Sequence, residues 1–498
     1  MRAVAVLLPV LLTAWVYHPV TRTYFFADDF VCFLSILNDG FLRFVLRPFG
    51  GHNLLVRNLA FYGSYQLFGM QPEPYFWIVL LTHLLNVGLL FRVLRNVTGS
   101  LALACFGATL WGTSPAQVGT LGWYSVYGQV LVATVLLVVL GGVTARARTG
   151  AAPSLRSAAA WYGLLLVGTM CFGTGVGVAL VFPAVLFLVL PAAWRRPGIR
   201  FAYLALPLVT IALYFAFRRF YGVLEPLTLN EVVAGNLSLP RVWVAAPMLP
   251  PLLAVSVDTA LRGTFLSTAH WPTGGTPIVL AVFTVALAVL LLHGDAATRR
   301  VTVAMLVLAA GIYTVIAIGR APFGRSDVSL TWLSAQLRYH YVGLIPTVVV
   351  VCLALAELGG MGPLRRLPRV PLLLAALAVG AIGYLRSDFR IDDRADVRAY
   401  LVSVQRGMVD EVVGRPLGTT VYLENGNPSP ILLGPVMARV KPLFPGRAAV
   451  FLLTHSGDEL DGHHVRFIER DPAVLARIGR WPEDPLAALL VRPDGLPR

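Results

Sequence analysis

The chain has 498 residues, of which 57% are hydrophobic and 13% are charged, and its net charge is +15. A soluble globular protein carries about 25% charged residues. This composition therefore excludes a soluble globular protein and predicts a polytopic membrane protein. The positive charge does not indicate a nucleic-acid partner, because much of it lies in short loops between apolar segments, as the positive-inside rule expects.

The first apolar segment resembles a signal peptide, with Arg2 ahead of the run 3–16, but it lacks a small-x-small cleavage site. We expect it to remain as a span with Arg2 in the cytoplasm. Further segments also have the roughly 20 mostly apolar residues that a spanning helix needs. The expected spans are 3–20, 75–94, 99–115, 127–143, 158–173, 176–193, 201–217, 276–293, 301–318, 341–357 and 370–385.

Arginines indicate the cytoplasmic loops, because they follow the second, fourth and sixth expected spans. These arginines are Arg92, Arg95, Arg146, Arg148, Arg156, Arg195, Arg196 and Arg200. The apolar segment 243–261 is ambiguous, since prolines interrupt it and a crossing there would turn Arg299 and Arg300 outward. We expect it to be re-entrant or interfacial, which gives about 11–12 spans and an outside C-terminus.

Two outer loops are long. The first, 21–74, contains the segments 41–49 and 54–70, in which Phe, Tyr and Leu alternate with arginines, as in helices that lie in the headgroup plane. The other long loop, 319–340, comes later in the chain and holds Arg320, Arg325, Asp327 and Arg338. We expect interfacial helices over the first loop.

The composition becomes that of a soluble domain beyond residue 385. Apolar or alternating runs at 419–423, 448–454 and 465–469 predict strands, and 395–413 predicts a helix. The expected fold is therefore an all-α polytopic membrane helix bundle over 1–385, followed by a small α/β soluble domain over 386–498 on the outer side.

Asp28 and Asp29 are adjacent carboxylates just past the first span. Such groups are expensive to desolvate at the rim of a bilayer, so their presence needs an explanation. One interpretation is a helix cap or a solvated loop. The other is a catalytic base at a membrane-embedded site, because perturbed carboxylates are frequent at functional sites.

Several stretches resemble, in order, the N-terminal part of the GT-C fold glycosyltransferases. They are 26–30 (FADDF), 51–58 (GHNLLVRN), 67–77 (LFGMQPEPYFW) and 81–86 (LTHLLN). More narrowly, they resemble bacterial relatives of protein O-mannosyltransferases and of lipid A aminoarabinose transferase. The later stretch 337–344 (LRYHYVGL) is similar to the Arg-Tyr-x-Tyr element that opens a late span in that superfamily.

The resemblance implies a glycosyltransferase of the bacterial inner (cytoplasmic) membrane. Such an enzyme moves a sugar from a polyprenyl-phosphate donor to a lipid, glycan or protein acceptor on the outer face. An acidic residue of the first outer loop is the base in the family, and that role falls here on Asp28 or Asp29. We favour Asp28, whose pKa a like-charged neighbour would raise. Asp29 would then assist, bind acceptor or coordinate a divalent cation, and metal dependence stays open.

Arg57 and Arg338 are the candidates for donor-phosphate contacts, because a guanidinium offers bidentate donors to phosphate. Tyr339 and His340 lie beside Arg338, and His52 is a candidate for acceptor or metal binding. The alternatives are a snorkelling Arg57, an aromatic belt with a topology-setting Arg338, and a solvent-facing His52. Arg320 and Arg325 are weaker phosphate candidates.

Two further groups of polar and aromatic residues have simpler interpretations. His83 and Asn86 lie at i and i+3 within a span, so we expect interhelical hydrogen bonds. Four residues of the second outer loop predict either a sugar-stacking surface or, more simply, an interfacial belt: Trp123, Tyr124, Tyr127 and Gln129.

Two other classes of membrane protein fit the sequence less well than a glycosyltransferase. A transporter or flippase should show charged groups buried in mid-span and internal repeats, and the sequence indicates neither. An O-antigen polymerase or ligase depends on a large late outer loop. Here the first outer loop is longer and carries the acids, which favours the glycosyltransferase.

Overall fold

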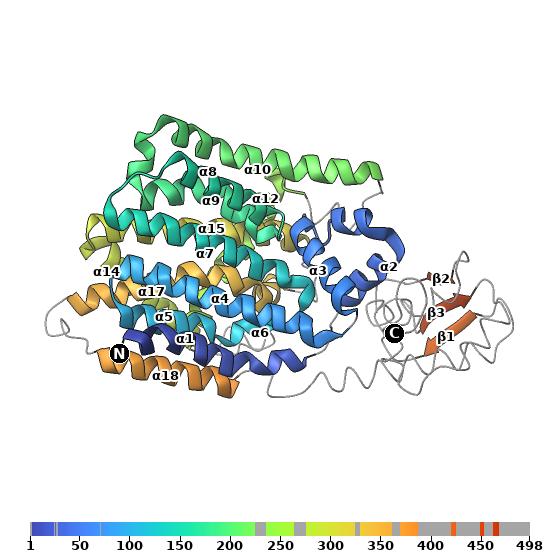
Figure 1. Cartoon of the computed structure of the whole chain (residues 1–498), viewed down its shortest axis with the longest axis horizontal. Coiled ribbons are helices and arrows are strands. Elements are labelled where there is room, and N and C mark those ends of the chain that lie inside the picture. Colours follow the sequence, from blue (N-terminus) through green and yellow to red (C-terminus); the bar gives the residue numbers. More distant parts are fainter. Residues whose placement is uncertain are drawn as a thin grey trace.

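The computed structural model describes residues 2–23, 25, 28–69, 71–224, 236–262, 275–323, 329–360 and 369–386, together with three short strands between 420 and 467. The long helices lie side by side as a bundle (Figure 1). They are α1 (Arg2–Tyr17), α4 (Pro72–Thr98), α5 (Leu101–Gly112), α7 (Tyr127–Thr149), α8 (Leu155–Thr169), α9 (Gly173–Val189), α10 (Pro197–Leu224), α14 (Thr276–His293), α15 (Ala296–Arg320), α17 (His340–Gly360) and α18 (Arg369–Arg386).

Eight helical segments in the described part are long and apolar enough to cross a membrane, by length and composition. They lie in α1 with the turn after it, α4, α7, α10, the segment 240–262, α14, α15 and α17. Shorter apolar helices occur at 101–112, 173–189 and 370–385. All eleven predicted spans overlap a helix of the bundle, so the expectation of an all-α, multi-pass membrane protein is confirmed.

The bundle has two distinct ends. Helices α2 (Asp28–Leu46) and α3 (Leu55–Phe68) lie at one end, called the Asp28 end below, and the N-terminus lies at the other (Figure 1). The arginines at the end of α4, between α7 and α8, and at the start of α10 belong to the N-terminal end, where the predicted topology puts the cytoplasm. The position of these arginines agrees with the predicted topology.

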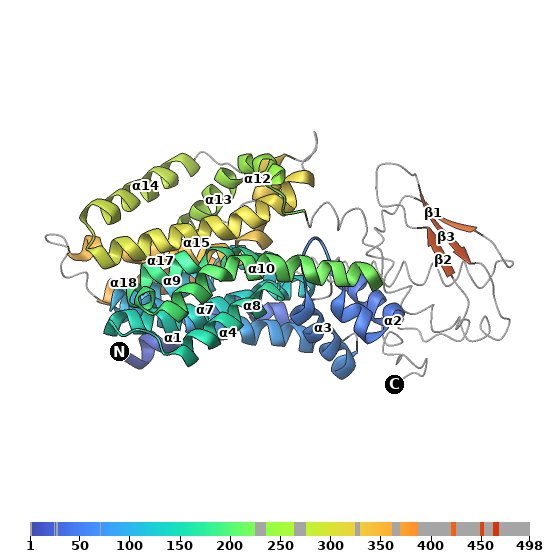
Figure 2. The ribbon, with the colours of Figure 1, turned by 90° about the horizontal axis from the view of Figure 1, so that it is seen from above.

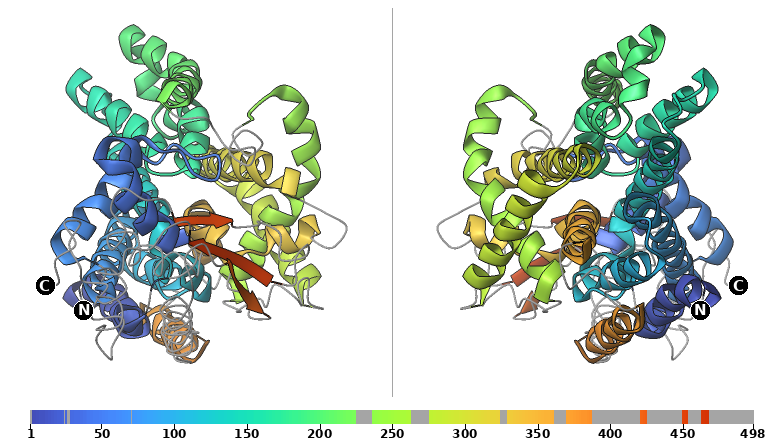
Figure 3. Two further views of the ribbon diagram at one scale, coloured as in Figure 1. Left: turned by 90° about the vertical axis from the view of Figure 1, so that its right-hand side faces the viewer. Right: turned by 90° about the vertical axis from the view of Figure 1, so that its left-hand side faces the viewer.

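Helices differ in how much of their surface the bundle covers. Helix α17 is largely buried, whereas α10 and α14 expose apolar side chains such as Leu208, Val223, Ile278 and Leu292. The end-on views show α10 and α14 at the periphery (Figure 3). Since water penalises such surfaces, these outer faces suit contact with lipid chains.

The proline-broken segment consists of α12 (Leu239–Ala245), a short turn at 246–248 and α13 (Leu249–Arg262). Helix α12 contacts the end of α15 at the Asp28 end, and Asp258 of α13 accepts a hydrogen bond from Thr276 at the start of α14. Helix α14 then leads to the opposite end, where α15 begins (Figure 2). The proline-broken segment and α14 together therefore make one net crossing of the bundle. This agrees with a re-entrant segment followed by a spanning α14. The segment 240–262 is nevertheless long enough to span by itself.

The first outer loop is more helical than expected. Helix α3 matches the predicted helix 54–70, but α2 begins at Asp28 rather than near residue 41. A kink at Gly40, whose φ of 71° suits glycine, divides α2 and precedes the predicted segment 41–49. Of the two simple interpretations of Asp28 and Asp29, a helix start agrees with the structure and a solvated loop does not, because both residues occupy the first turn of α2, where negative charge is favoured.

Three strands of the C-terminal region lie near their predicted positions. They are β1 (Thr420–Glu424), β2 (Ala449–Leu452) and β3 (Gly462–Phe467), which pair antiparallel in the order β1-β3-β2. The predicted helix 395–413 lies outside the described residues. Helix α18 ends at Arg386, and the α/β character and boundary of a soluble domain stay predictions.

Candidate functional site

Five segments that are distant in sequence meet at the Asp28 end. They are the start of α2, the hairpin 49–52, the junction 113–127 between α5 and α7, the end of α15, and the turn Leu337–Tyr339 before α17. Hydrogen bonds and ring contacts join them, as described below. Both long predicted outer loops, together with the outer loop that holds Trp123, therefore contribute to one site.

Asp29 is completely buried and anchors α2. Its Oδ1 accepts hydrogen bonds from the Ser125 main-chain N–H at 2.6 Å and from the Ser125 hydroxyl at 2.7 Å. Hydrogen bonds to a carboxylate are stronger than neutral ones, so this pair of bonds fixes the start of α2 against the turn Tyr124–Val126. Asp29 is therefore held in place by the fold.

Asp28, its neighbour, is only partly buried, and its side chain forms no hydrogen bond with the described residues. Burial raises the pKa of Asp28, and the positive charges of Arg57, Arg338 and Arg320 oppose that rise. The adjacent acids predicted a raised pKa caused by a like-charged neighbour. The raised pKa has a different leading cause, namely the loss of water around the carboxylate.

Arg57 points into the protein from α3. It is 2% exposed, its Nη1 donates to the Cys32 sulfur at 2.9 Å, and its guanidinium carbon lies 6.0 Å from the centre of the Phe61 ring. Its Nε has no hydrogen-bond partner in the described part of the chain. A snorkelling arginine would be exposed at its tip, so that interpretation of Arg57 was wrong.

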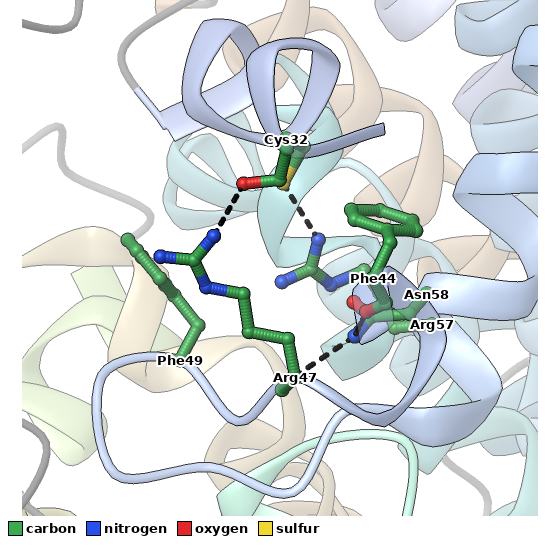
Figure 4. Close-up of a pocket in the computed structure, with 7 residues that line it drawn as sticks. Cys32, Phe44, Arg47, Phe49, Arg57 and Asn58 are labelled. Atoms are coloured by element: carbon green, nitrogen blue, oxygen red, sulfur yellow. Dashed lines mark hydrogen bonds between the residues drawn. The ribbon is translucent and has the colours of Figure 1, made fainter. Parts of the chain in front are cut away.

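A small pocket of about 10 Å³, which has room for about one water molecule, lies between α2 and α3 beside Arg57 (Figure 4). Arg47 donates from Nη1 to the Ser35 hydroxyl at 2.7 Å, and Asn58 donates to the main-chain carbonyl of Arg47 at 3.0 Å. Arg47 and Arg57 both reach toward the side chains of α2 in this view. The pocket is thus lined by two guanidinium groups, with thiol, hydroxyl and amide groups around them.

Arg338 lies between two aromatic rings. Its guanidinium carbon is 5.1 Å from the centre of the Trp123 ring and 5.1 Å from that of Tyr339, which is buried. Gln129 donates to the main-chain carbonyl of Arg338 and so fixes the turn that carries it. Arg320 approaches the same tyrosine, with its guanidinium carbon 5.8 Å from the ring centre.

His52 does not face solvent, which corrects the simpler expectation for it. Its ring stacks on Phe172, with 4.2 Å between the ring centres, and its Nε2 lies 3.3 Å from Nη2 of Arg320. A guanidinium only donates, so Nε2 accepts and the ring is neutral. Burial and the nearby Arg320, Arg57 and Arg218 lower the pKa of His52 well below its usual value.

This surrounding of arginines also makes His52 a poor cation ligand. Among the described residues, no group of three His, Cys, Asp or Glu side chains could hold a metal ion. The divalent cation suggested for Asp29 thus has no assembled ligand set in this part of the chain.

His340 has a structural role inside the helix bundle. It is fully buried, its Nδ1 accepts from the Tyr313 hydroxyl at 3.0 Å, and its Nε2 donates to the Ser334 carbonyl at 2.8 Å. Because both ring nitrogens have partners, the structure does not bring His340 to the site as a substrate ligand. Instead, it closes the turn between α16 (Leu330–Ser334) and α17.

His83 and Asn86 make the interhelical hydrogen bonds that were predicted. His83 accepts from the Tyr341 hydroxyl at 2.7 Å and donates to the Gly112 carbonyl at 3.0 Å, and Asn86 donates to the Val130 carbonyl at 3.0 Å. These bonds join α4 to α5, α7 and α17.

The aromatic group of the second outer loop is mostly buried. Tyr124, Tyr127 and Gln129 lie in the interior, where Tyr124 bonds to Ser64 and Tyr127 to Thr82, each at 2.9 Å. The expectation of a sugar-stacking surface or an interfacial belt was wrong for these three. Only Trp123 reaches the site, against Arg338.

Sequence reasoning missed Ser125 and Cys32, which bind Asp29 and Arg57 across a large sequence separation. No local pattern indicates such partners. Arg320 did carry a signal, as an arginine at the outer end of a span. Comparison with protein-family models and with curated proteins gives no match.

Proposed function

We propose that the protein is an integral-membrane glycosyltransferase that moves a sugar from a polyprenyl-phosphate donor to an acceptor on the outer face of the bacterial inner membrane. The main observation that supports this proposal is the environment of the Asp28 side chain. A partly buried carboxylate with a raised pKa lies among Arg57, Arg320 and Arg338, none of which forms an ion pair with a carboxylate in the described part of the chain.

The chemistry of glycosyl transfer matches these groups. The acceptor hydroxyl or amine attacks the anomeric carbon, its proton passes to the Asp28 carboxylate, and the bond from that carbon to the phosphate oxygen breaks. A base with a raised pKa accepts a proton more readily near neutral pH. The positive charges of Arg57, Arg320 and Arg338 around Asp28 stabilise the second negative charge that develops on the departing prenyl phosphate. Asp29 holds α2 so that Asp28 faces these arginines.

The membrane setting supports the donor class. The site lies at one end of a bundle whose α10 and α14 expose apolar faces to lipid. A lipid-linked sugar can approach along such a surface without leaving the bilayer. The proposal includes a GT-C fold for the helix bundle and an acceptor that is a lipid, a glycan or a protein. It also includes a soluble C-terminal domain on the outer side.

A transporter or flippase is the second candidate, because one observation favours it. Asp258 is fully buried and forms an ion pair with Arg262 inside the candidate span 240–262. Both residues lie toward the C-terminal end of α13 rather than in mid-span, so they do not contradict the expectation that mid-span positions carry no charge. Ionisable groups inside membrane segments are often functional, but this pair neutralises itself and lies away from Asp28.

Reconstituted vesicles test the proposal. Purified protein would be assayed with a panel of polyprenyl-phosphate sugars and with matched diphosphates, comparing wild type with Asp28→Asn and Asp29→Asn. Turnover that collapses in Asp28→Asn while the protein stays folded supports the proposal. Turnover with diphosphate donors alone would favour the polymerase or ligase class, and lipid flipping without turnover would favour the flippase.

A further inference from the structure

Arg320 and Arg338 converge on one oxygen. Both guanidinium groups lie against the Tyr339 ring and interact with its hydroxyl, with Arg338 Nη2 at 3.5 Å from that oxygen. Tyr339 is 4% exposed, so this contact is shielded from water. Two cations therefore share one acceptor oxygen near Asp28, which leaves room for a further anion to offset the like charges brought together.

Aromatic rings contact the guanidinium groups of Arg320 and Arg338, a role that carboxylates usually play for a buried arginine. Trp123 and Tyr339 both lie against Arg338, and no ion pair joins Arg320 or Arg338 to a carboxylate in the described residues. Ring contacts of this kind attract the cation without a bidentate acceptor. A guanidinium has five N–H donors, so donors remain for an anion beside those that Tyr339 and His52 accept.

His52 orients Arg320 without neutralising it. The hairpin that carries His52 turns at Gly50 and Gly51, both with positive φ, and closes with reciprocal main-chain hydrogen bonds between Phe49 and His52 at 3.0 and 3.1 Å. The neutral ring accepts from Arg320 at 3.3 Å. A carboxylate in that place would hold Arg320 equally well but would cancel its charge.

Gly173 lets this ring pack, because a Cβ there would overlap the His52 ring on its Nδ1 side. Phe172 covers the ring from the same segment. The result is a continuous row of stacked or bonded groups, in the order Trp123, Arg338, Tyr339, Arg320, His52 and Phe172.

We propose that Arg320 and Arg338 form one binding site for the phosphate group of a prenyl phosphate, and that His52 is the positioning residue for Arg320. The ligand class rests on the proposed function, whereas the anion site follows from the arginines themselves. Arg57 donates to Cys32, whereas Arg320 and Arg338 both contact Tyr339, so Arg320 is the partner that we assign to Arg338.

Direct binding tests this without requiring turnover. The full-length protein in nanodiscs would be titrated with farnesyl phosphate by calorimetry, with inorganic phosphate and phosphatidate-containing nanodiscs as separate arms. We expect Arg320→Gln and Arg338→Gln each to raise Kd about 10-fold or more, as the loss of a charged hydrogen-bonding group does. Arg195→Gln, an exposed arginine at the opposite end, should leave Kd unchanged.

Two variants at His52 separate positioning from folding. The His52→Gln variant introduces a side-chain amide whose oxygen can still accept from Arg320, so it should keep Kd within about 2-fold, while His52→Leu should raise Kd about 5-fold. Melting temperatures of all variants verify the fold. If His52→Leu has the same Kd as wild type, His52 does not position Arg320.

The remaining outcomes are also decisive. Unchanged affinity in Arg320→Gln overturns the shared site even if the protein proves to be a glycosyltransferase. Farnesyl phosphate binding that requires both arginines, in a protein with no sugar transfer, keeps the site and rejects the proposed function. Equal competition by phosphatidate overturns the prenyl phosphate as its ligand.

Discussion

Asp29 and Ser125 are joined by two hydrogen bonds, from the main-chain N–H at 2.6 Å and from the hydroxyl at 2.7 Å, although 96 residues separate them in the chain. The contact fixes the first turn of α2 against the turn before α7. Its consequence is a division of work between two adjacent acids. Asp29 holds the helix, and Asp28 meets the arginines of the site.

This division predicts different results for the two acids. Asp28→Asn should lower kcat about 10²–10⁴-fold, the usual loss of a general base, with the fold intact. Asp29→Ala should instead destabilise the protein by about 1–3 kcal/mol, because it leaves two buried donors of Ser125 without their acceptor. Activity assays in vesicles and thermal melts in detergent measure the two effects. Equal losses of stability in both variants would contradict the division.

The raised pKa of Asp28 predicts a pH profile. The rate constant kcat/KM should fall as the pH decreases through this pKa, which lies above the ordinary value of 3.8, because the protonated acid cannot act as a base. A profile that is flat between pH 4 and pH 8 would exclude Asp28 as the base.

The same pKa predicts an effect on stability with a definite sign. The folded protein binds the Asp28 proton more tightly than the unfolded chain, so Asp28 contributes stability at acidic pH that is lost as the pH rises through the folded pKa. Asp28→Asn cannot ionise and should therefore melt above wild type at pH 8. The difference should vanish near pH 4, and melts across this range measure it.

Close helix packing predicts that Gly128 tolerates no side chain. A Cβ at Gly128 in α7 would overlap the main-chain carbonyl of Cys171, so Gly128→Ala should cost about 1–3 kcal/mol of stability. Gly88 in α4 has open space around it and provides the matched control. Similar melting temperatures for both alanine variants would show that α7 does not approach Cys171 this closely.

The hydrogen bonds of His83 predict a coupled pair. Tyr341→Phe removes the donor to His83 Nδ1 and should cost about 1–2 kcal/mol, as for a buried polar group left without its partner. His83→Phe should cost a similar amount, and the double variant should cost less than the two together. Additive losses would argue against the hydrogen bond between these side chains.

The sequence alone determined the class of the protein and most of its helices. Apolar length defines a span, and the arginine distribution distinguishes the two ends, because both are local properties set by the bilayer. Adjacency in the sequence also made the Asp28–Asp29 pair visible. The His83 and Asn86 hydrogen bonds were predictable because polar groups inside a span need partners.

Only the tertiary structure decided which way the side chains of the site face. Arg57 was interpretable as a snorkelling residue and His52 as a solvent-facing one, since the sequence near them is the same in either case. Arg57 is buried beside Cys32, and His52 bonds to Arg320, which is 268 residues away. Such contacts depend on how distant helices pack, and the free energy that selects them comes from the whole bundle rather than from any local pattern.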